Sequence, residues 1–200
     1  MREIITVACL SVYLLAFSAS LSYARPQFSP SAYDLVNAVN ALRSSKGMPL
    51  YELDPLLMLS AQGHADYLAS IGLNVGNGHV GLGGTDADAR ALAVGYTYVP
   101  GLDIVEAWAN ANVHIQLDQI IYGFWADPDH MHVMLHWRGQ HVGAGVTEKD
   151  GYVYYVLNVA AYWGDGGLTQ QPTSSFAYSG AQQGEYPVSQ YIAPVIVASP

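Results

Sequence analysis

Apolar residues recur with the period of a helix near the start of the chain. Between residues 31 and 47 they fall on one helical face, at Leu35, Val36, Val39 and Leu42. Ser31 is a suitable N-cap for this helix, and Gly47 is suited to end it. The pattern therefore predicts an amphipathic helix across this segment.

The stretch "YELDPLLMLSAQGHADYLASIG" predicts a second helix of the same kind. Asp54 precedes Pro55, which combines a good N-cap with a good first helical residue. One face carries the apolar residues Leu56, Leu59, Ala65 and Leu68, and Gly72 closes the helix. Residues 72–84, "GLNVGNGHVGLGG", are glycine-rich and predict a loop.

The middle of the chain gives weaker patterns. Thr85 and Asp88 are spaced as a capping box and predict a short third helix. We expect a short strand near residues 104–108 and then a helix near 117–125. The segment "DPDHMHVML" predicts another short helix, with Asp127 as its cap and proline in its first turn.

The clearest local pattern lies near the end of the domain. Two runs rich in Val and Tyr, "HVGAGV" and "YVYYVLNVAAYWG", are joined by "TEKDG". The dipeptide Asp150-Gly151 is a strong hairpin signal. Because helices come first and antiparallel strands last, the fold class is predicted to be α+β.

The two ends of the chain differ from the centre. Residues 4–17 form an apolar run followed by small residues, which predicts a signal peptide over residues 1–24 with cleavage after Ala24; an uncleaved membrane anchor is the alternative. The domain is predicted over residues 31–163. Residues 164–200 are rich in Gly, Ser, Gln and Pro and are predicted to be a linker or tail, or a connection to a further domain.

Composition narrows the choice of function. The chain has a formal net charge of -9 and only 7 Lys and Arg residues, so nucleic acid is not an expected partner. With 51% hydrophobic residues it has enough apolar surface for a core. The single cysteine, Cys9, lies inside the predicted signal, so the mature chain must be held together without disulfides.

Two residues stand out as candidates for chemistry. His79 lies in "GNGHVGLGG", where small neighbours leave its ring free to reach a cleft, although a surface loop histidine is the alternative. Glu106 is a lone charge in "DIVEAWA". If it is buried it needs a histidine or a cation as partner, and otherwise it points outward from a half-exposed strand.

A cluster of four histidines follows, at His130, His132, His136 and His141. On a helix, residues two apart point in different directions, so only one of His130 and His132 is expected to face a site. The chain has no HExxH motif and no close zinc spacing. A metal cluster formed by these residues alone is not predicted.

The order of these segments resembles the CAP superfamily, the SCP-like extracellular proteins, in its cysteine-free bacterial form. The resemblance covers about residues 33–162 and is carried by "GHVG", "WADPDHMHVML", "HVGAGV" and "DGYVYYVLNVA". It implies a three-layer α-β-α sandwich with an antiparallel sheet and a cleft lined by two histidines and acidic residues. His79 matches the first histidine, His130 the second, and Glu106 the signature glutamate. The family glutamate is usually followed by Asn where this chain has Ala107, and the second acid has no sound match.

The resemblance implies a secreted, extracellular or cell-envelope protein that binds a lipid, a wall fragment or a peptide through His79, Glu106 and His130. After signal removal no transmembrane span is expected. His79 and His130 are also the expected ligands of a divalent metal such as zinc, with an open coordination position. The alternative is an extracellular hydrolase that uses metal-bound water or a histidine–glutamate pair as general base. No serine or cysteine nucleophile is recognisable, so a binding module is the favoured interpretation.

Overall fold

The computed structural model describes residues 29–97 and 99–163. The predicted signal peptide, residues 1–24, and the predicted tail, residues 164–200, lie outside the described residues, so the proposed division of the chain stays a prediction. None of the helices in the described residues is long and apolar enough to span a membrane.

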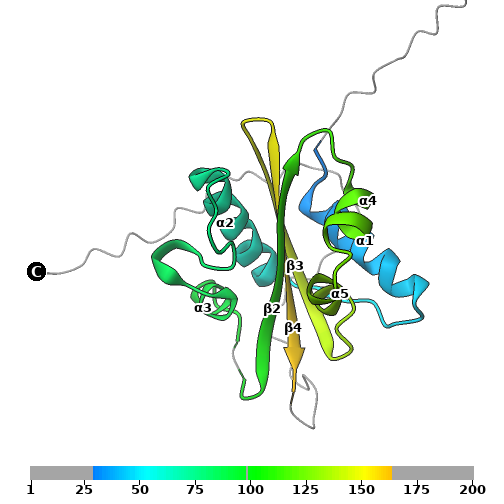
Figure 1. Cartoon of the computed structure of the whole chain (residues 1–200). Coiled ribbons are helices and arrows are strands. Elements are labelled where there is room, and N and C mark those ends of the chain that lie inside the picture. The colour runs from blue at the N-terminus through cyan, green and yellow to red at the C-terminus, as the bar shows by residue number, and fades with distance from the viewer. Residues whose placement is uncertain (1–28, 98, 164–200) are drawn as a thin grey trace, which may run out of the picture. The chain divides into compact units, whose positions relative to one another are not determined.

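One sheet forms the centre of the domain (Figure 1). Three long strands pair antiparallel in the order β3-β4-β2, and a two-residue strand pairs parallel with β3. The strands are β1 (Glu52–Leu53), β2 (Leu102–Asn112), β3 (Gly139–Lys149) and β4 (Tyr152–Tyr162). Asp150 and Gly151 form the predicted turn, and both have the positive φ that a tight two-residue hairpin requires.

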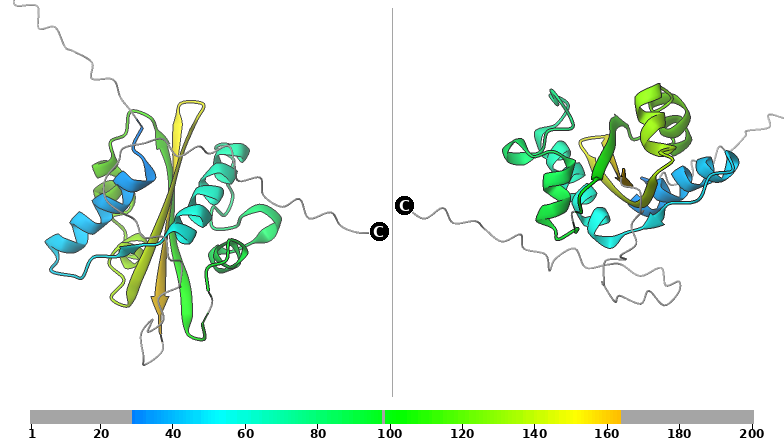
Figure 2. Two further views of the ribbon diagram at one scale, coloured as in Figure 1. Left: turned by 180° about the vertical axis from the view of Figure 1, so that it is seen from behind. Right: turned by 90° about the horizontal axis from the view of Figure 1, so that it is seen from below.

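Helices cover both faces of this sheet, which confirms the predicted three-layer sandwich. In Figures 1 and 2, α2 and α3 lie on one side of the strands, and α1, α4 and α5 lie on the other. The helical segments are α1 (Ala32–Ser45), α2 (Pro55–Ile71), η1 (Leu82–Gly84), α3 (Ala87–Ala93), α4 (Leu117–Gln119), η2 (Ile120–Phe124) and α5 (Pro128–Met134). The segment η2 is a π-helical turn.

Most of the predicted helix ends are confirmed. The Ser31 hydroxyl accepts from the Asp34 amide, 3.1 Å away, and the Asp34 carboxylate accepts from Ser31, which completes a capping box. The Asp54 carboxylate accepts from the first two free amides of α2 at 2.8 and 3.0 Å. Gly72 ends α2 with a positive φ, and Asp127 caps α5.

Three expectations for the middle of the chain were wrong in detail. Asp86, rather than a Thr85–Asp88 capping box, caps α3 by accepting from the Ala89 amide, because Asp88 instead accepts from the Ile104 amide of β2. The strand predicted near residues 104–108 is eleven residues long, since it pairs with β4 along its whole length. The helix predicted near 117–125 is divided into α4 and η2.

A buried arginine fixes α5 against α1. The Arg43 side chain donates to the carbonyls of Pro49, Met134 and His136 at 2.8, 3.2 and 3.2 Å, and its guanidinium lies 3.5 Å from the centre of the Tyr51 ring. Because helix C-termini carry free carbonyls, this cation satisfies the end of α5 and holds that helix in place.

The closest packing of the fold is between α2 and β3. A Cβ atom at Gly143 would lie 2.0 Å from the Leu57 carbonyl carbon, and one at Gly145 would lie 2.2 Å from the Ala61 carbonyl oxygen. The helix backbone therefore rests directly on the sheet at these two glycines. This contact determines the distance between α2 and the sheet.

We predict that Gly143→Ala lowers the free energy of unfolding by about 2–3 kcal/mol, because the new methyl group overlaps backbone atoms that cannot move separately. The matched control is Gly63→Ala, an exposed position within α2 where a Cβ meets nothing within 4 Å. That change should raise the stability by about 0.5–1 kcal/mol through helix propensity. Urea denaturation measures both, and equal effects of the two substitutions would contradict the close contact.

Candidate functional site

The candidate site is built around Glu106 in β2. Its carboxylate is buried, with a side-chain exposure of 3%. One oxygen, Oε2, accepts a hydrogen bond from Nη2 of Arg90, a residue of α3. The other, Oε1, lies 3.1 Å from Nδ1 of His79. A buried carboxylate is costly unless it is paired and hydrogen-bonded, and these two groups supply both requirements.

Arg90 also fixes the loop that carries His79. Its Nη1 group donates to the main-chain carbonyls of His79 and Thr85 at 3.1 and 2.7 Å. The same guanidinium therefore contacts both the carboxylate and the two ends of the 79–85 segment. This arrangement couples the position of the loop to the charge on Glu106.

His64 of α2 also holds the loop that carries His79. The ring is fully buried, and its Nε2 group donates to the carbonyl of Gly78 at 2.8 Å and lies 3.8 Å from Oε1 of Glu106. Burial is the main cause that lowers the pKa of His64, although the neighbouring carboxylate opposes it. His64 is therefore a neutral structural residue, consistent with its position within a predicted helix.

The glycine before His79 is required by a tryptophan. A Cβ at Gly78 would lie 2.0 Å from Cε2 of Trp108, so only glycine lets the loop pass over this ring. The His79 ring then meets Trp108 edge-on, with their centres 6.4 Å apart, and half of the His79 side chain, 50%, is exposed to solvent. His79 is therefore a surface residue, as the alternative had it, whose ring is also held by Trp108 and Glu106.

His130 is held in a second, separate way. Its Nδ1 lies 2.6 Å from Oδ2 of Asp127, the residue that caps α5, and its ring stacks on Trp125 with the ring centres 6.0 Å apart. The main-chain and side-chain hydrogen bonds from His130 lower the pKa of the Asp127 carboxyl. The side chain of His130 is 28% exposed.

The two histidines are connected through their tryptophans. The indole Nε1 of Trp125 donates to the main-chain oxygen of Trp108 at 3.1 Å. His79 contacts the ring of one member of this pair, and His130 stacks on the other. The structure thus joins His79 to Glu106 directly, whereas His130 makes no direct bond to either within residues 29–97 and 99–163.

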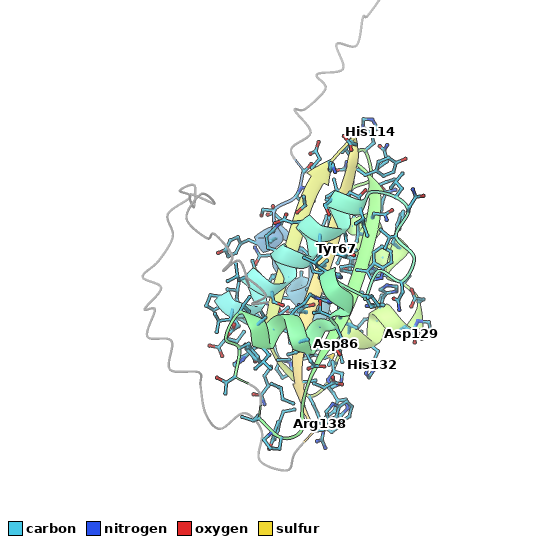
Figure 3. All side chains as sticks on the ribbon, turned by 90° about the vertical axis from the view of Figure 1, so that its left-hand side faces the viewer. Tyr67, Asp86, His114, Asp129, His132 and Arg138 are labelled. Carbon is cyan, nitrogen blue, oxygen red and sulfur yellow. The ribbon has the colours of Figure 1, made fainter. Side chains whose placement is uncertain are left out.

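The other histidines of the cluster lie elsewhere. His136 is buried and accepts the Arg138 amide, and burial lowers its pKa. His141 is buried and hydrogen-bonded to the Tyr96 hydroxyl at 2.8 Å, and His132 is exposed on α5, where Figure 3 marks it. Of the two histidines on α5, His130 is held by Asp127 and Trp125, and His132 is exposed.

The match to known proteins is clear at the level of the family. A family model described as CAP, the cysteine-rich secretory protein family, matches residues 36–160. The chain belongs to this family. It does so with a single cysteine in the whole sequence, so the packing described above, rather than disulfides, holds this CAP domain together.

Solved structures agree on the fold of the CAP domain. The domain is similar to an outer surface protein of Borrelia burgdorferi, with 19% identity, a TM-score of 0.50, and coverage of 64% of this chain and 90% of that one. It is also similar to an extracellular protein of Bacillus anthracis that contains an SCP domain, with 17% identity and a TM-score of 0.52. That match covers 65% of this chain and 40% of the Bacillus protein. No curated protein matches the chain.

Sequence reasoning missed four residues of the candidate site. Arg90, His64, Trp108 and Trp125 all hold a predicted residue in place. One clue to Arg90 was available, because a buried glutamate needs a cation and the chain has only 7 Lys and Arg residues. Trp125 lies in the quoted segment "WADPDHMHVML" but was not assigned a role, and no local pattern identifies His64 or Trp108, whose contacts span elements distant in sequence.

We predict that Arg90→Met destabilises the domain by about 3–5 kcal/mol, because it leaves the Glu106 carboxylate buried without a cation. The double variant Arg90→Met/Glu106→Gln should recover at least about 1.5 kcal/mol relative to the sum of the single changes. Urea denaturation of the wild type, the Arg90→Met and Glu106→Gln single variants and the double variant measures this coupling. Lys46→Met, at an exposed position after α1, is the control and should change stability by less than about 0.5 kcal/mol. Strictly additive effects at positions 90 and 106 would contradict the ion pair.

Proposed function

We propose that this CAP domain is a secreted module that binds a small ligand at His79, supported by Glu106 and flanked by His130. The observation that carries the proposal is the half-exposed His79 ring held by a buried carboxylate. Nδ1 faces Glu106, so Nε2 is the ring nitrogen left for a ligand. An imidazole fixed in one orientation binds better than one that must be ordered on binding.

His130 supports the proposal because it is held in the same manner. Its Nδ1 is bonded to Asp127, which leaves Nε2 as the second ring nitrogen available to a ligand. The tryptophans beside the two histidines add apolar and aromatic surface. Such a combination of few polar groups and aromatic rings suits a lipid, a wall fragment or a peptide.

Zinc would be held by the Nε2 atoms of His79 and His130. Carboxylates that orient ligating histidines are common around metals, and both histidines have one. Catalytic zinc sites, however, use three protein ligands. Across the described residues no group of three or more His, Cys, Asp or Glu side chains is arranged to hold a metal. We therefore propose binding through hydrogen bonds and include zinc as one probe.

A hydrolase is the second candidate, and the His79–Glu106 contact favours it. A histidine oriented by a carboxylate through Nδ1 is the arrangement used by general bases. In such a reaction His79 would remove a proton from water through Nε2, and Glu106 would stabilise the imidazolium.

The binding test uses four probes: zinc chloride, oleate, a muropeptide fragment and a mixed peptide library. We predict that one of them binds the chain saturably and that its affinity falls at least tenfold in the His79→Ala variant. Tryptophan fluorescence and calorimetry measure binding, since Trp108 contacts the ring. The matched control is His114→Ala, at the far end of the domain from Asp86 and Asp129 in Figure 3. If His79→Ala leaves every binding curve unchanged, the proposed site is wrong. Turnover of ester or peptide probes that is lost in His79→Ala would favour the hydrolase.

Export is the second part of the proposal. Support comes from the apolar run at residues 4–17 and from the two similar proteins, one named an outer surface protein and the other extracellular. We predict that the chain, expressed with its own N-terminus in a bacterium, is recovered outside the cytoplasm with Arg25 as its first residue. N-terminal sequencing tests this, and an intact Met1 on the recovered protein would contradict it.

A further inference from the structure

Strand β2 is the edge of the sheet next to the candidate site. It pairs with β4 along all eleven residues, and within the described residues no strand lies on its other side. In Figure 1 it runs between α3 on one flank and α5 on the other. Edge strands are ready templates for another chain unless they are blocked.

Two side chains block this edge, one at Ile104 near the start of the strand and one at Trp108 near its middle. The Ile104 amide donates to Asp88 at 3.0 Å, and the Trp108 carbonyl accepts from Trp125 at 3.1 Å. Residues of an antiparallel strand direct their main-chain groups alternately to the two sides. Ile104, Glu106 and Trp108 therefore all direct these groups away from β4.

Between the two blocks, main-chain groups that face away from β4 are unpaired in the described part of the chain; among the residues that carry them, Glu106 and Trp108 are partly exposed, whereas Ile104 is buried. Within residues 29–97 and 99–163, four main-chain groups here have no hydrogen-bond partner. They are the Ile104 carbonyl, the Glu106 amide and carbonyl, and the Trp108 amide. Glu106 is partly exposed as a residue although its side chain is 3% exposed, so the exposed surface belongs to its main chain. The unpaired groups from Ile104 to Trp108 span about 14 Å of strand, which matches the length of about five peptide residues.

The flanks of this stretch differ in character. On the side of α2 and α3, a neighbouring chain would meet His79 and Trp108. On the side of α5 it would meet His130 with its partner Asp127, and the exposed acid Asp129, which Figure 3 marks. Arg90 is occupied by Glu106, and the chain carries a net charge of -9. The surroundings therefore favour a peptide with positive side chains.

We propose that β2 binds an extended, positively charged peptide as an added antiparallel strand, centred on Glu106; this rests on the proposed ligand-binding function and names its ligand class. The peptide residue opposite Glu106 donates its amide to the Glu106 carbonyl and accepts the Glu106 amide. Its two second neighbours bond the Ile104 carbonyl and the Trp108 amide. Side chains of the residues on either side of the central one point toward α5 and its acids.

The test uses the ¹⁵N-labelled full chain and three capped peptides. The probe is Ac-Val-Lys-Val-Lys-Val-NH₂, which places both lysines on the α5 side. The second peptide is identical but carries an N-methyl group on the central valine, so that it keeps the charge and loses the central main-chain donor. The third replaces both lysines by glutamate.

The expected result is a saturable shift of the Glu106 and Trp108 amide signals with the lysine probe and slower hydrogen exchange at both. Affinity should fall at least tenfold for the N-methyl peptide and for the glutamate peptide. Equal binding of the N-methylated peptide, or binding that leaves these two amides unchanged, would overturn the proposal.

His79→Ala separates this inference from the proposed function. If the lysine peptide does not bind while another probe binds and loses affinity in His79→Ala, the proposal of an added strand is wrong and the proposed function stands. Should the probe shift both amides equally in wild type and in His79→Ala, and no probe depend on His79, the proposed histidine site is wrong and the strand binding stands.

Discussion

The charge of Glu106 lies buried in the edge strand of the sheet, and the parts around it are arranged to satisfy that charge. Arg90 brings α3 to the strand, and His79 brings the glycine-rich loop. His64 holds the same loop from α2 through the Gly78 carbonyl. Since a buried carboxylate without partners is strongly unfavourable, we expect these contacts to stabilise one another. The exposed half of the His79 ring is a consequence of this arrangement.

The tryptophans have a complementary role on β2. Trp108 excludes any residue but glycine from position 78, and Trp125 both supports His130 and covers one main-chain carbonyl of the edge. The edge is therefore blocked at Ile104 by Asp88 and at Trp108 by Trp125, and the main-chain groups of Glu106 between them are unpaired within the described residues. Glu106 thus contributes its side chain to the fold and its main chain to the proposed binding surface.

The sequence predicted the features that depend on neighbouring residues. The caps at Ser31 and Asp54 and the turn at Gly151 follow from contacts within a few positions. The cap of α3 was wrong because Asp88 is drawn to β2, sixteen positions further along the chain. His79 and Glu106 were predicted from the family resemblance and from a lone charge in an apolar strand. Arg90 was missed, since its pairing exists only once α3 has docked.

The central claim is that Glu106 holds the Nδ1 proton of His79 and leaves Nε2 free for a ligand. Long-range ¹H–¹⁵N NMR at alkaline pH distinguishes the two neutral forms of this ring directly. The account predicts the Nδ1–H form in the wild type and its loss in Glu106→Gln, with the exposed His132 ring unchanged. A wild-type His79 protonated mainly on Nε2 would contradict it.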